Sequence, residues 1–439
     1  MTHLSLPRLH EASLSLDHSG LIHILSQVEN LLVIQDLDGV CMGLVKDPLT
    51  RTIDPAYVEA TRAFGDHFYV LTNGEHIGQR GVNGILERTV GDRPYLQQSG
   101  SHLPGLAAGG VQWQDRHGEV THPGVSEAEL TFLAQVPQRM EARLRQFFAH
   151  RAEVNLDLGA IAQGIQTAVL DNVASPTANL NSFYELLRHQ PDTYRALQQA
   201  MKSLTDELLQ EAEQQGLTGS FFVHYAPNLG RDSHGLEILR PATETDSGTT
   251  DFQFMLRGAV KEAGVLFILN HYYYRRTGTH PLGPDFNVRQ APADHAALLE
   301  LVKSHFDPAL MPRMVGVGDT VNSQVLMNEG KIIVRRGGSD RNFLQLIQDI
   351  GTAMGNGNVI VYVDSSQGEV KNRRPLKLST ADGALQVVDG PGDPGDTADP
   401  LTLNVVFPGG HSQYCRAFQT AAQQRLRQGW DGTDESGVN

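Results

Sequence analysis

Short apolar runs that end in polar residues mark three buried strands. Residues 30–35 and 67–71 form two of these runs, and a helix-like stretch over 55–64 lies between them. Strands that are apolar on both faces are typical of parallel sheets covered by helices, and the strand–helix–strand order predicts parallel pairing. A third run, 313–317, follows a helical pattern over 252–274. The pattern therefore predicts an α/β fold with a parallel sheet.

The middle of the chain has a different pattern. Long amphipathic helices are predicted over 127–148 and 181–215, and a strand-like run follows over 220–225. This change predicts an inserted α+β domain between two halves of one sheet. The predicted divisions are 1–122 and 247–439 for the two halves of the core and 123–246 for the insertion. A segment rich in Gly, Pro and Asp, 381–400, is predicted to be a loop.

Polar residues follow all three predicted core strands. Asp36 and Asp38 come after the first strand, Thr72 after the second and Asp319 after the third. Because ligands bind at the carboxyl ends of strands in open α/β sheets, we expect these side chains to converge. Paired carboxylates at such an edge suggest a metal site. A carboxylate can also serve as a covalent nucleophile, since it is ionised at pH 7 and needs no base.

This set of residues predicts phosphoryl transfer. An anionic Asp would repel a phosphate dianion, and Mg²⁺ held by Asp36 and Asp319 would neutralise both. Asp38 has the position of a general acid and base, which would protonate the leaving oxygen and then activate water. The Thr72 hydroxyl can donate to a phosphate oxygen. Lys261 and Arg257, four residues apart in a predicted helix, can each supply a cation, and the sequence leaves the choice open.

Every one of these signals has an ordinary structural explanation when taken alone. Asp-Gly pairs are common in turns, and a lysine on a helix is usually a solvated charge. Residues 337–341 (GGSDR) begin like a nucleophile elbow but lack its last glycine. The Gly-x-Gly segments at 316–318 and 355–357 lack the third glycine of a dinucleotide-binding fingerprint. The combination of three strand ends with the required residue types favours catalysis.

Composition and charge narrow the classes of partner. The 439 residues carry a net charge of -15, from 35 Lys and Arg and 50 Asp and Glu, which is the wrong sign for broad nucleic-acid binding. Cys41 and Cys415 lie at opposite ends of the chain without zinc-ligand spacing, which suggests a reducing compartment and no disulfide. The apolar runs are far shorter than the ~18 residues of a membrane span. We therefore expect a cytoplasmic protein with neither nucleic-acid nor membrane partners.

Together these motifs resemble the four signature motifs of the haloacid dehalogenase superfamily of phosphatases. The segments that carry the resemblance are DLDGV at 36–40, Thr72, Lys261 or Arg257, and Gly318-Asp319. The insertion resembles the mobile cap of the sugar phosphatases in that superfamily. More closely, the chain resembles the glucosylglycerol-phosphate phosphatases, a family of cyanobacterial salt-tolerance enzymes. The passages that match include VIQDLDGVCMGLVKDPL, DSGTTDFQFMLRGAVKEAGV, GVGDTVNSQV, RRGGSDR and VYVDSSQGEVKNR.

The resemblance implies a Rossmann-like core with a cap and Mg²⁺-dependent hydrolysis of 2-O-glucosylglycerol 3-phosphate. The products would be phosphate and the osmolyte glucosylglycerol, formed through an aspartyl-phosphate. The implied catalytic residues are Asp36 as nucleophile, Asp38 as acid and base, Thr72, and Lys261 or Arg257. The implied metal ligands are Asp36, Asp38, Asp319 and Asn322. The glucosylglycerol-phosphate synthase of the same pathway is an expected partner.

The chain departs from the superfamily pattern in two motifs. Many sugar phosphatases read GDxxND, whereas Asn322 is followed here by Ser323, so a second carboxylate near the metal is missing. The third motif usually reads KG, whereas this chain has Arg257-Gly258 and then Lys261.

Substrate choice is expected to lie in the cap, because the core contacts only the phosphate. A glucosyl group needs several hydrogen-bonding partners, although each candidate has the alternative of being an ordinary cap residue. The cap candidates are His224, Tyr225, Asn228, Arg231 and Asp232, with Asn172, Ser175 and Asn179 as a second cluster. Asn73, Glu75 and His76, beside the second core motif, are further candidates for contact with the substrate. Two other functions stay open: a phosphatase of sucrose or trehalose phosphate, and a regulator that binds a sugar phosphate without turnover.

Overall fold

The chain divides into two compact units in the computed structural model. Unit 1 comprises Met1–Gly124 and Val260–Asn439, and unit 2 comprises Val125–Ala259. The structure describes residues 15–45, 48–151, 156–170, 172–226, 228–231, 237–243, 247–258, 260–328, 331–369, 373–381 and 383–429.

Unit 1 contains the long sheet and the helices that cover it. Its strands are β1 (Leu31–Gln35), β2 (Phe68–Leu71), β3 (Gly105–Ala107), β4 (Gln112–Gln114), β5 (Val120–Thr121), β11 (Arg313–Gly318), β12 (Asn322–Asn328), β13 (Lys331–Gly337), β14 (Val359–Val363), β15 (Lys377–Ala381), β16 (Ala384–Asp389) and β17 (Val405–Phe407). Its helices are α1 (His18–Gln27), α2 (Pro55–Arg62), α3 (Val82–Val90), α4 (Arg93–Gln98), α9 (Lys261–Thr277), α10 (His295–His305), α11 (Arg341–Met354) and α12 (Gly410–Arg427).

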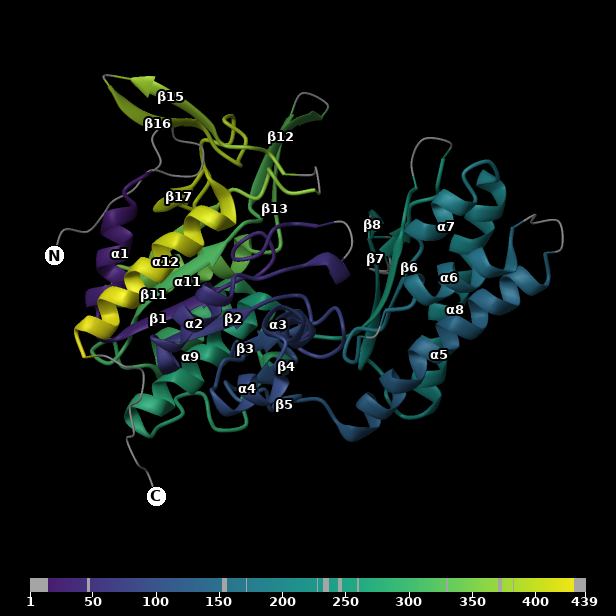
Figure 1. Cartoon of the computed structure of the whole chain (residues 1–439), viewed down its shortest axis with the longest axis horizontal. Coiled ribbons are helices and arrows are strands. Elements are labelled where there is room, and N and C mark those ends of the chain that lie inside the picture. The colour runs from purple at the N-terminus through teal and green to yellow at the C-terminus, as the bar shows by residue number, and fades with distance from the viewer. Residues whose placement is uncertain are drawn as a thin grey trace. The chain divides into compact units, whose positions relative to one another are not determined.

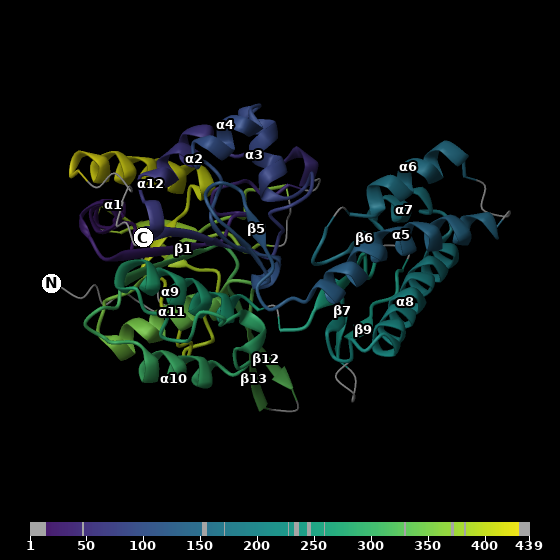
Figure 2. The same ribbon diagram turned by 90° about the horizontal axis from the view of Figure 1, so that it is seen from below.

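The long sheet has the order β17-β14-β11-β1-β2-β3-β4-β5. Neighbours from β17 to β3 pair in parallel, and β4 and β5 extend the sheet in the antiparallel sense. The α/β class and the parallel pairing of β1 with β2 are therefore confirmed. Helices α1, α2 and α12 cover one face and α9, α10 and α11 the other, as Figures 1 and 2 show. This double cover explains why every residue of β1 and β2 is buried.

A buried hydrogen-bond network fixes the end of β1 from which the site begins. The side-chain oxygen of Gln35 accepts hydrogen bonds from the hydroxyls of Tyr57 and Tyr414, both at 2.8 Å. Tyr57 lies in α2 and Tyr414 in α12, so two helices hold the last strand residue before Asp36. A buried amide needs such partners, because an unsatisfied polar group costs about 1–3 kcal/mol.

Unit 2 packs helices against a small antiparallel sheet of order β6-β10-β7. Its strands are β6 (Thr177–Asn179), β7 (Phe221–Ala226), β8 (Asn228–Arg231), β9 (Glu237–Leu239) and β10 (Asp251–Leu256), and its helices are α5 (Glu127–Ala149), α6 (Leu158–Ala168), α7 (Asn181–Leu186) and α8 (Pro191–Gln214). β10 alternates between buried and partly buried residues, as expected for a sheet covered on one face. Phe132 of α5 packs against Phe221 and Phe254 of this sheet.

Three predictions about elements were wrong in part. The helix predicted over 252–274 is strand β10 followed by α9, because the apolar residues at the start of that run alternate and pair with β6 and β7. The unit boundary consequently falls after Ala259 rather than after 246. The helix predicted over 181–215 is divided into α7 and α8, since Pro191 starts a new helix. The predicted loop 381–400 contains β16.

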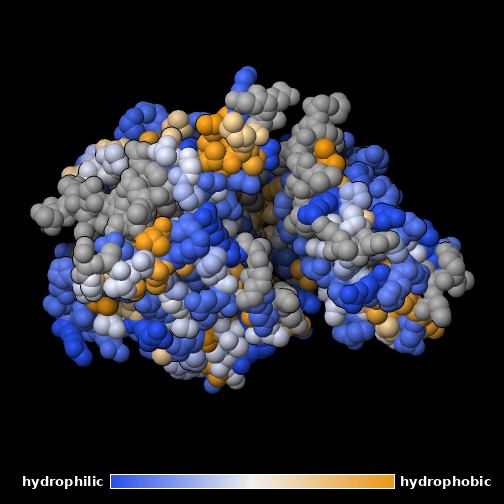
Figure 3. Space-filling view, turned by 90° about the horizontal axis from the view of Figure 1, so that it is seen from above, coloured by the Kyte–Doolittle hydropathy of each residue, from blue (hydrophilic) through white to orange (hydrophobic). Residues whose placement is uncertain are grey.

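Two hairpins, β12–β13 and β15–β16, lie outside the long sheet. The first exposes a hydrophobic patch, visible in Figure 3, to which Met327, Ile332, Ile333 and Val334 contribute. Among the described residues, every helix is too short or too polar to cross a bilayer.

Candidate active site

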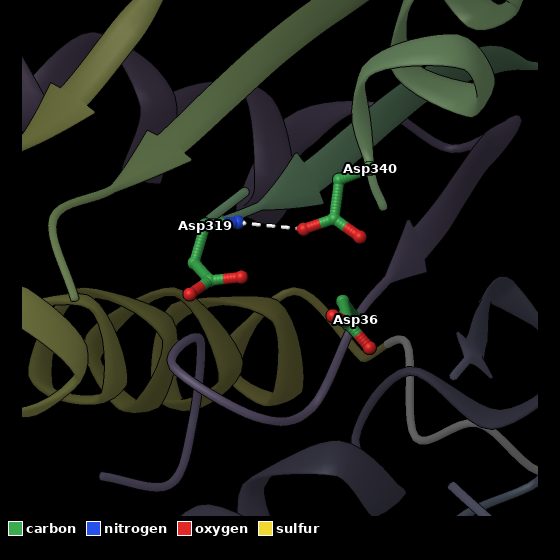
Figure 4. A group of neighbouring side chains, drawn as sticks. All are labelled: Asp36, Asp319 and Asp340. Carbon is green, nitrogen blue, oxygen red and sulfur yellow. Dashed lines mark hydrogen bonds between the residues drawn. The ribbon is translucent and has the colours of Figure 1, made fainter. Parts of the chain in front are cut away.

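Three carboxylates converge at the carboxyl ends of β1 and β11. Asp36 follows β1 and Asp319 follows the adjacent strand β11, while Asp340 directly precedes α11. Each offers an oxygen within 4.8 Å of the others, and all three residues are buried. Figure 4 shows the three side chains turned toward one another, with the backbone N–H of Asp319 bonded to Asp340. The predicted convergence of Asp36 and Asp319 is therefore seen in the structure.

Two glycines allow the carboxylates to come this close. A Cβ on Gly39 would lie 2.2 Å from Oδ2 of Asp319, and a Cβ on Gly318 would lie 2.7 Å from Cβ of Asp340. Gly39 also has φ +80, a conformation that side chains rarely adopt. The turn at Gly39, which ends the Asp-Leu-Asp-Gly motif, therefore passes directly over Asp319.

Asp340 links the other charged groups of the site. Its Oδ2 accepts hydrogen bonds from the backbone N–H of Asp319 at 2.9 Å and of Thr320 at 3.0 Å. Its Oδ1 accepts a hydrogen bond from Nζ of Lys261 at 2.8 Å. One buried carboxylate thus orients both the start of the Asp319 loop and the lysine.

Lys261 is the cation that the structure brings to the carboxylates. It is buried, and its Nζ lies 3.1 Å from Oδ1 of Asp36. Lys261 opens α9, where a positive charge opposes the helix dipole. Its position is explained by the two carboxylates rather than by local helix preference. Arg257 belongs to unit 2, where it is exposed and its backbone N–H donates to Ser220.

Burial and mutual repulsion shift the pKa values of this cluster. Burial raises the pKa of Asp36 well above its usual range, the Asp340 charge adds to this, and Lys261 opposes it. Burial and Asp340 raise the pKa of Asp319 to about 7. Burial acts against ionised Asp340, but Lys261 and the two backbone N–H groups hold its pKa below the ordinary value. Burial likewise acts against charged Lys261, and Asp340 and Asp36 outweigh it, so its pKa is raised. Among the described residues, Lys261 is the cation against Asp36 and Asp340, and Arg373 is the cation against Asp319.

The second-strand motif contributes a buried hydroxyl. Thr72 is 2% exposed, and its Oγ1 accepts a hydrogen bond from the backbone N–H of Gly74 at 3.2 Å. Asn73 is exposed. His76 is fully buried, and its ring contacts the carbonyl oxygen of Gly105 at 3.0 Å. The substrate contact of His76 stays a prediction. Glu75 is also buried and accepts a hydrogen bond from Gln112.

Other predicted core residues lie outside the carboxylate cluster. The Asp38 carboxylate pairs with Nε of Arg51 at 3.0 Å. Asn322 is exposed at the start of β12, opposite Gly337. The predicted metal set therefore differs from the observed cluster, in which Asp340 joins Asp36 and Asp319.

The candidate sugar-binding residues of unit 2 make contacts within that unit. His224 Nδ1 lies 2.9 Å from Oε2 of Glu237, and the side chain of Asn179 donates to Asp251 at 2.6 Å. Tyr225 is buried, and Asn172 bonds Ser175. Asn228 and Arg231 lie in β8, and Asp232 falls outside the described residues.

The sequence matches a known family over nearly its whole length. The model of the glucosylglycerol-phosphate phosphatase family matches residues 30–422. The chain belongs to this family. The glucosylglycerol-phosphate phosphatase of Synechocystis sp. is 61% identical over 417 residues, which cover 95% of this chain and 98% of that protein. The resemblance inferred from the motifs is therefore confirmed.

Solved structures of lower similarity also match this member of the family. The C-terminal domain of the Candida albicans trehalose synthase regulatory protein is 10% identical, with a TM-score of 0.45 over 92% of this chain and 99% of that one. The C-terminal domain of C. albicans trehalose-6-phosphate phosphatase is 10% identical, with a TM-score of 0.42 over 94% and 99%.

Sequence reasoning missed Asp340, the residue that completes the cluster. The superfamily pattern places a second carboxylate at position 323, directly after Asn322. In this chain Asp340 supplies it, 21 residues after Asp319. The β12–β13 hairpin fills that interval and returns the chain to the strand end. The Gly337-Gly338 pair before Asp340 was the available signal, since paired glycines after a strand mark a close approach of the backbone.

Proposed function

We propose that this protein hydrolyses 2-O-glucosylglycerol 3-phosphate to glucosylglycerol and phosphate, through an aspartyl-phosphate on Asp36. The buried contact of Asp36 with Lys261, completed by Asp340 and Asp319, is the observation that carries the chemistry. Family membership and the relative's printed activity support the substrate. The product would be a neutral osmolyte made during salt stress. The synthase partner and the cytoplasmic location stay predictions.

The carboxylate cluster fits a divalent cation. Its oxygen donors are of the kind that Mg²⁺ prefers, and Oδ1 of Asp36 is buried without a hydrogen bond even though Lys261 lies nearby. Asp36 and Asp319 would hold Mg²⁺, with Asp340 beside them. Bound Mg²⁺ would neutralise charge on the phosphoryl group.

The protein's own residues account for the two half-reactions. A carboxylate oxygen of Asp36 attacks phosphorus, and the bond from phosphorus to the glycerol oxygen breaks as Asp38 gives that oxygen a proton. Water then loses a proton to Asp38 and attacks the aspartyl-phosphate, which releases phosphate and restores Asp36. Lys261 stabilises charge on the transferring group, and Thr72 donates its hydroxyl to it.

Phosphate release from 2-O-glucosylglycerol 3-phosphate tests this function directly. The assay compares it with sucrose 6-phosphate, trehalose 6-phosphate and p-nitrophenyl phosphate, with Mg²⁺ and with EDTA. We expect preference for the first ester, loss of release in EDTA, and a decrease of at least about 10³-fold in kcat for Asp36→Asn, which removes the nucleophile.

Asp66→Asn provides a matched control. Asp66 lies in unit 1 and forms an exposed ion pair with Arg275. Its replacement should leave kcat within about twofold. Faster turnover of another sugar phosphate would keep the mechanism and reject the substrate. Turnover by Asp36→Asn at the wild-type rate would reject the mechanism, and no release from any ester would favour the binding regulator.

A further inference from the structure

A polar pocket of about 690 Å³ opens beside the carboxylate cluster, wholly within unit 1. The β12–β13 hairpin forms part of its lining, and Thr320, Tyr362 and the Arg373-Arg374 pair form other parts. Its volume lies within the range of ~300–1,000 Å³ that is typical of small-molecule sites. The proposed phosphoryl chemistry at Asp36 makes no use of it.

The pocket adjoins the reaction centre through Thr320 and Arg373. Thr320 Oγ1 donates to Oδ1 of Asp319 at 2.5 Å and accepts a hydrogen bond from Nη2 of Arg373 at 2.9 Å. Nε of Arg373 lies 3.5 Å from Oδ2 of Asp319. A ligand in the pocket would therefore lie one side chain away from the proposed metal-binding carboxylate.

The charges around the pocket are balanced, which argues against a polyanion as its ligand. Arg336 forms two hydrogen bonds with Asp396, Arg374 pairs with Asp389, and Arg373 lies against Asp319. The remaining lining charges are those of Arg335 and Asp393. Three of the four lining guanidinium groups thus pair with carboxylates, and Asp393 is a further negative charge in the lining, so the pocket offers many hydrogen-bond donors with little net charge. Such a lining suits a neutral molecule rich in hydroxyl groups.

The β12–β13 hairpin adds two polar side chains, Gln324 and Arg335, to the lining of the pocket. Gln324 of β12 is directly opposite Arg335 of β13, and opposite residues of an antiparallel pair point to the same face. Both are exposed and line the pocket. Within the part of the chain that the structure describes, Arg335 makes neither an ion pair nor a side-chain hydrogen bond. Its five N–H donors are free to meet ligand hydroxyls.

We infer that this pocket binds the glucosylglycerol part of the substrate, so that the core unit itself contributes to substrate choice through Arg335 and Gln324. This inference rests on the proposed function. It differs from the sequence-based expectation that substrate choice lies in the inserted unit. Arg335 and Gln324 are specificity residues under this inference, since they would touch the leaving group and not the phosphorus.

Replacement of Arg335 by Met tests the inference, since Met keeps an unbranched chain and removes the donors. We expect the ratio of kcat/KM for glucosylglycerol phosphate to kcat/KM for p-nitrophenyl phosphate to fall about tenfold, the effect of one lost charge-assisted hydrogen bond. The loss should appear in KM. Gln324→Met should lower the ratio in the same direction, and the double variant should lower it further.

Lys331→Met is the matched control, because Lys331 is an exposed cation of the same strand that does not line the pocket. It should leave the ratio unchanged. The neutral product glucosylglycerol should inhibit the wild type competitively, and Arg335→Met should weaken this inhibition about tenfold relative to inhibition by inorganic phosphate.

An unchanged ratio in both Arg335→Met and the double variant would overturn the inference. Equal weakening of phosphate and glucosylglycerol inhibition would also overturn it, because the pocket would then serve an anion. If wild-type protein shows no turnover of glucosylglycerol phosphate but hydrolyses p-nitrophenyl phosphate, the proposed substrate fails instead, and the two failures are distinguishable.

Discussion

At the scale of single residues, the site departs from local preferences for charge and burial. Lys261 sits at the positive end of a helix, and three carboxylates share a buried space. Each feature is unfavourable alone, because like charges repel and burial penalises the charged forms. Together they hold a nucleophile and a cation in contact, and such departures from local preference are expected at functional sites.

Asp340→Asn tests the role of the carboxylate that links these groups. The substitution preserves shape but removes the charge that holds Lys261 and weakens the acceptor for two backbone N–H groups. We expect kcat to fall at least about 10²-fold with little change in KM, since positioned electrostatic groups contribute on that scale. The thermal midpoint should also fall, because the substitution leaves buried Lys261 without its closer partner and the lowered pKa of Asp340 means that its charge favours the folded chain.

The control is Asp349→Asn, on the same helix α11, where Asp349 pairs with His295 in a partly exposed position. It should leave kcat within about twofold. A wild-type kcat in Asp340→Asn would exclude a positioning role for Asp340.

At the scale of elements, a second buried ion pair fixes the start of α11. Arg341 opens this helix, pairs with Asp399 and donates to the carbonyl of Asn322, so it joins the helix, the hairpin and the loop before β17. Both charged side chains are nearly fully buried. Because Asp340 directly precedes Arg341, the same pair supports the position of the active-site carboxylate.

Arg341→Met should lower the free energy of unfolding by about 3–5 kcal/mol, since it leaves Asp399 charged and unpaired in the interior. Urea unfolding followed by tryptophan fluorescence measures this loss. Arg275→Met removes an exposed pair with Asp66 and should cost less than about 1 kcal/mol. The double variant Arg341→Met/Asp399→Leu should recover part of the loss, and a single variant as stable as wild type would contradict the argument.

At the scale of the whole molecule, buried histidines make stability depend on pH. Burial lowers the pKa of His67, His76 and His271 to about 4. These rings are neutral in the folded chain at pH 5, whereas the unfolded chain, with histidine pKa values near 6.5, binds protons there. Stability contributed by the neutral rings is therefore fully present above about pH 6.5 and is lost as pH falls toward 4.

We expect the thermal midpoint to fall between pH 7 and pH 5, and His76→Gln to reduce that fall. His76 alone can contribute on the order of 2 kcal/mol to the difference in stability between pH 7 and pH 5. The exposed His305, replaced by Gln, should leave the pH dependence as in wild type. An equal fall in wild type and His76→Gln, measured by calorimetry, would contradict the assignment.

The sequence by itself determined the class of fold and the chemistry of the strand ends. Runs such as 31–35, 68–71 and 313–318 predict strands because most of their residues are apolar, and Asp36, Thr72 and Asp319 each directly follow one of these strands. Their convergence follows from parallel pairing alone. The family could be inferred as well, because its motifs are spread along most of the chain.

Only the tertiary structure decided which distant groups complete the site. Lys261 rather than Arg257 meets Asp36, because β10 ends in unit 2 and α9 begins in unit 1. Asp340 takes the place of the carboxylate that the superfamily pattern has beside Asn322, because the β12–β13 hairpin brings the chain back to the strand end. No local sequence pattern predicts the length of that hairpin. The polar pocket likewise joins residues from separate segments. Spacing along the chain predicts contacts within one element, whereas contacts between elements depend on how the chain folds back.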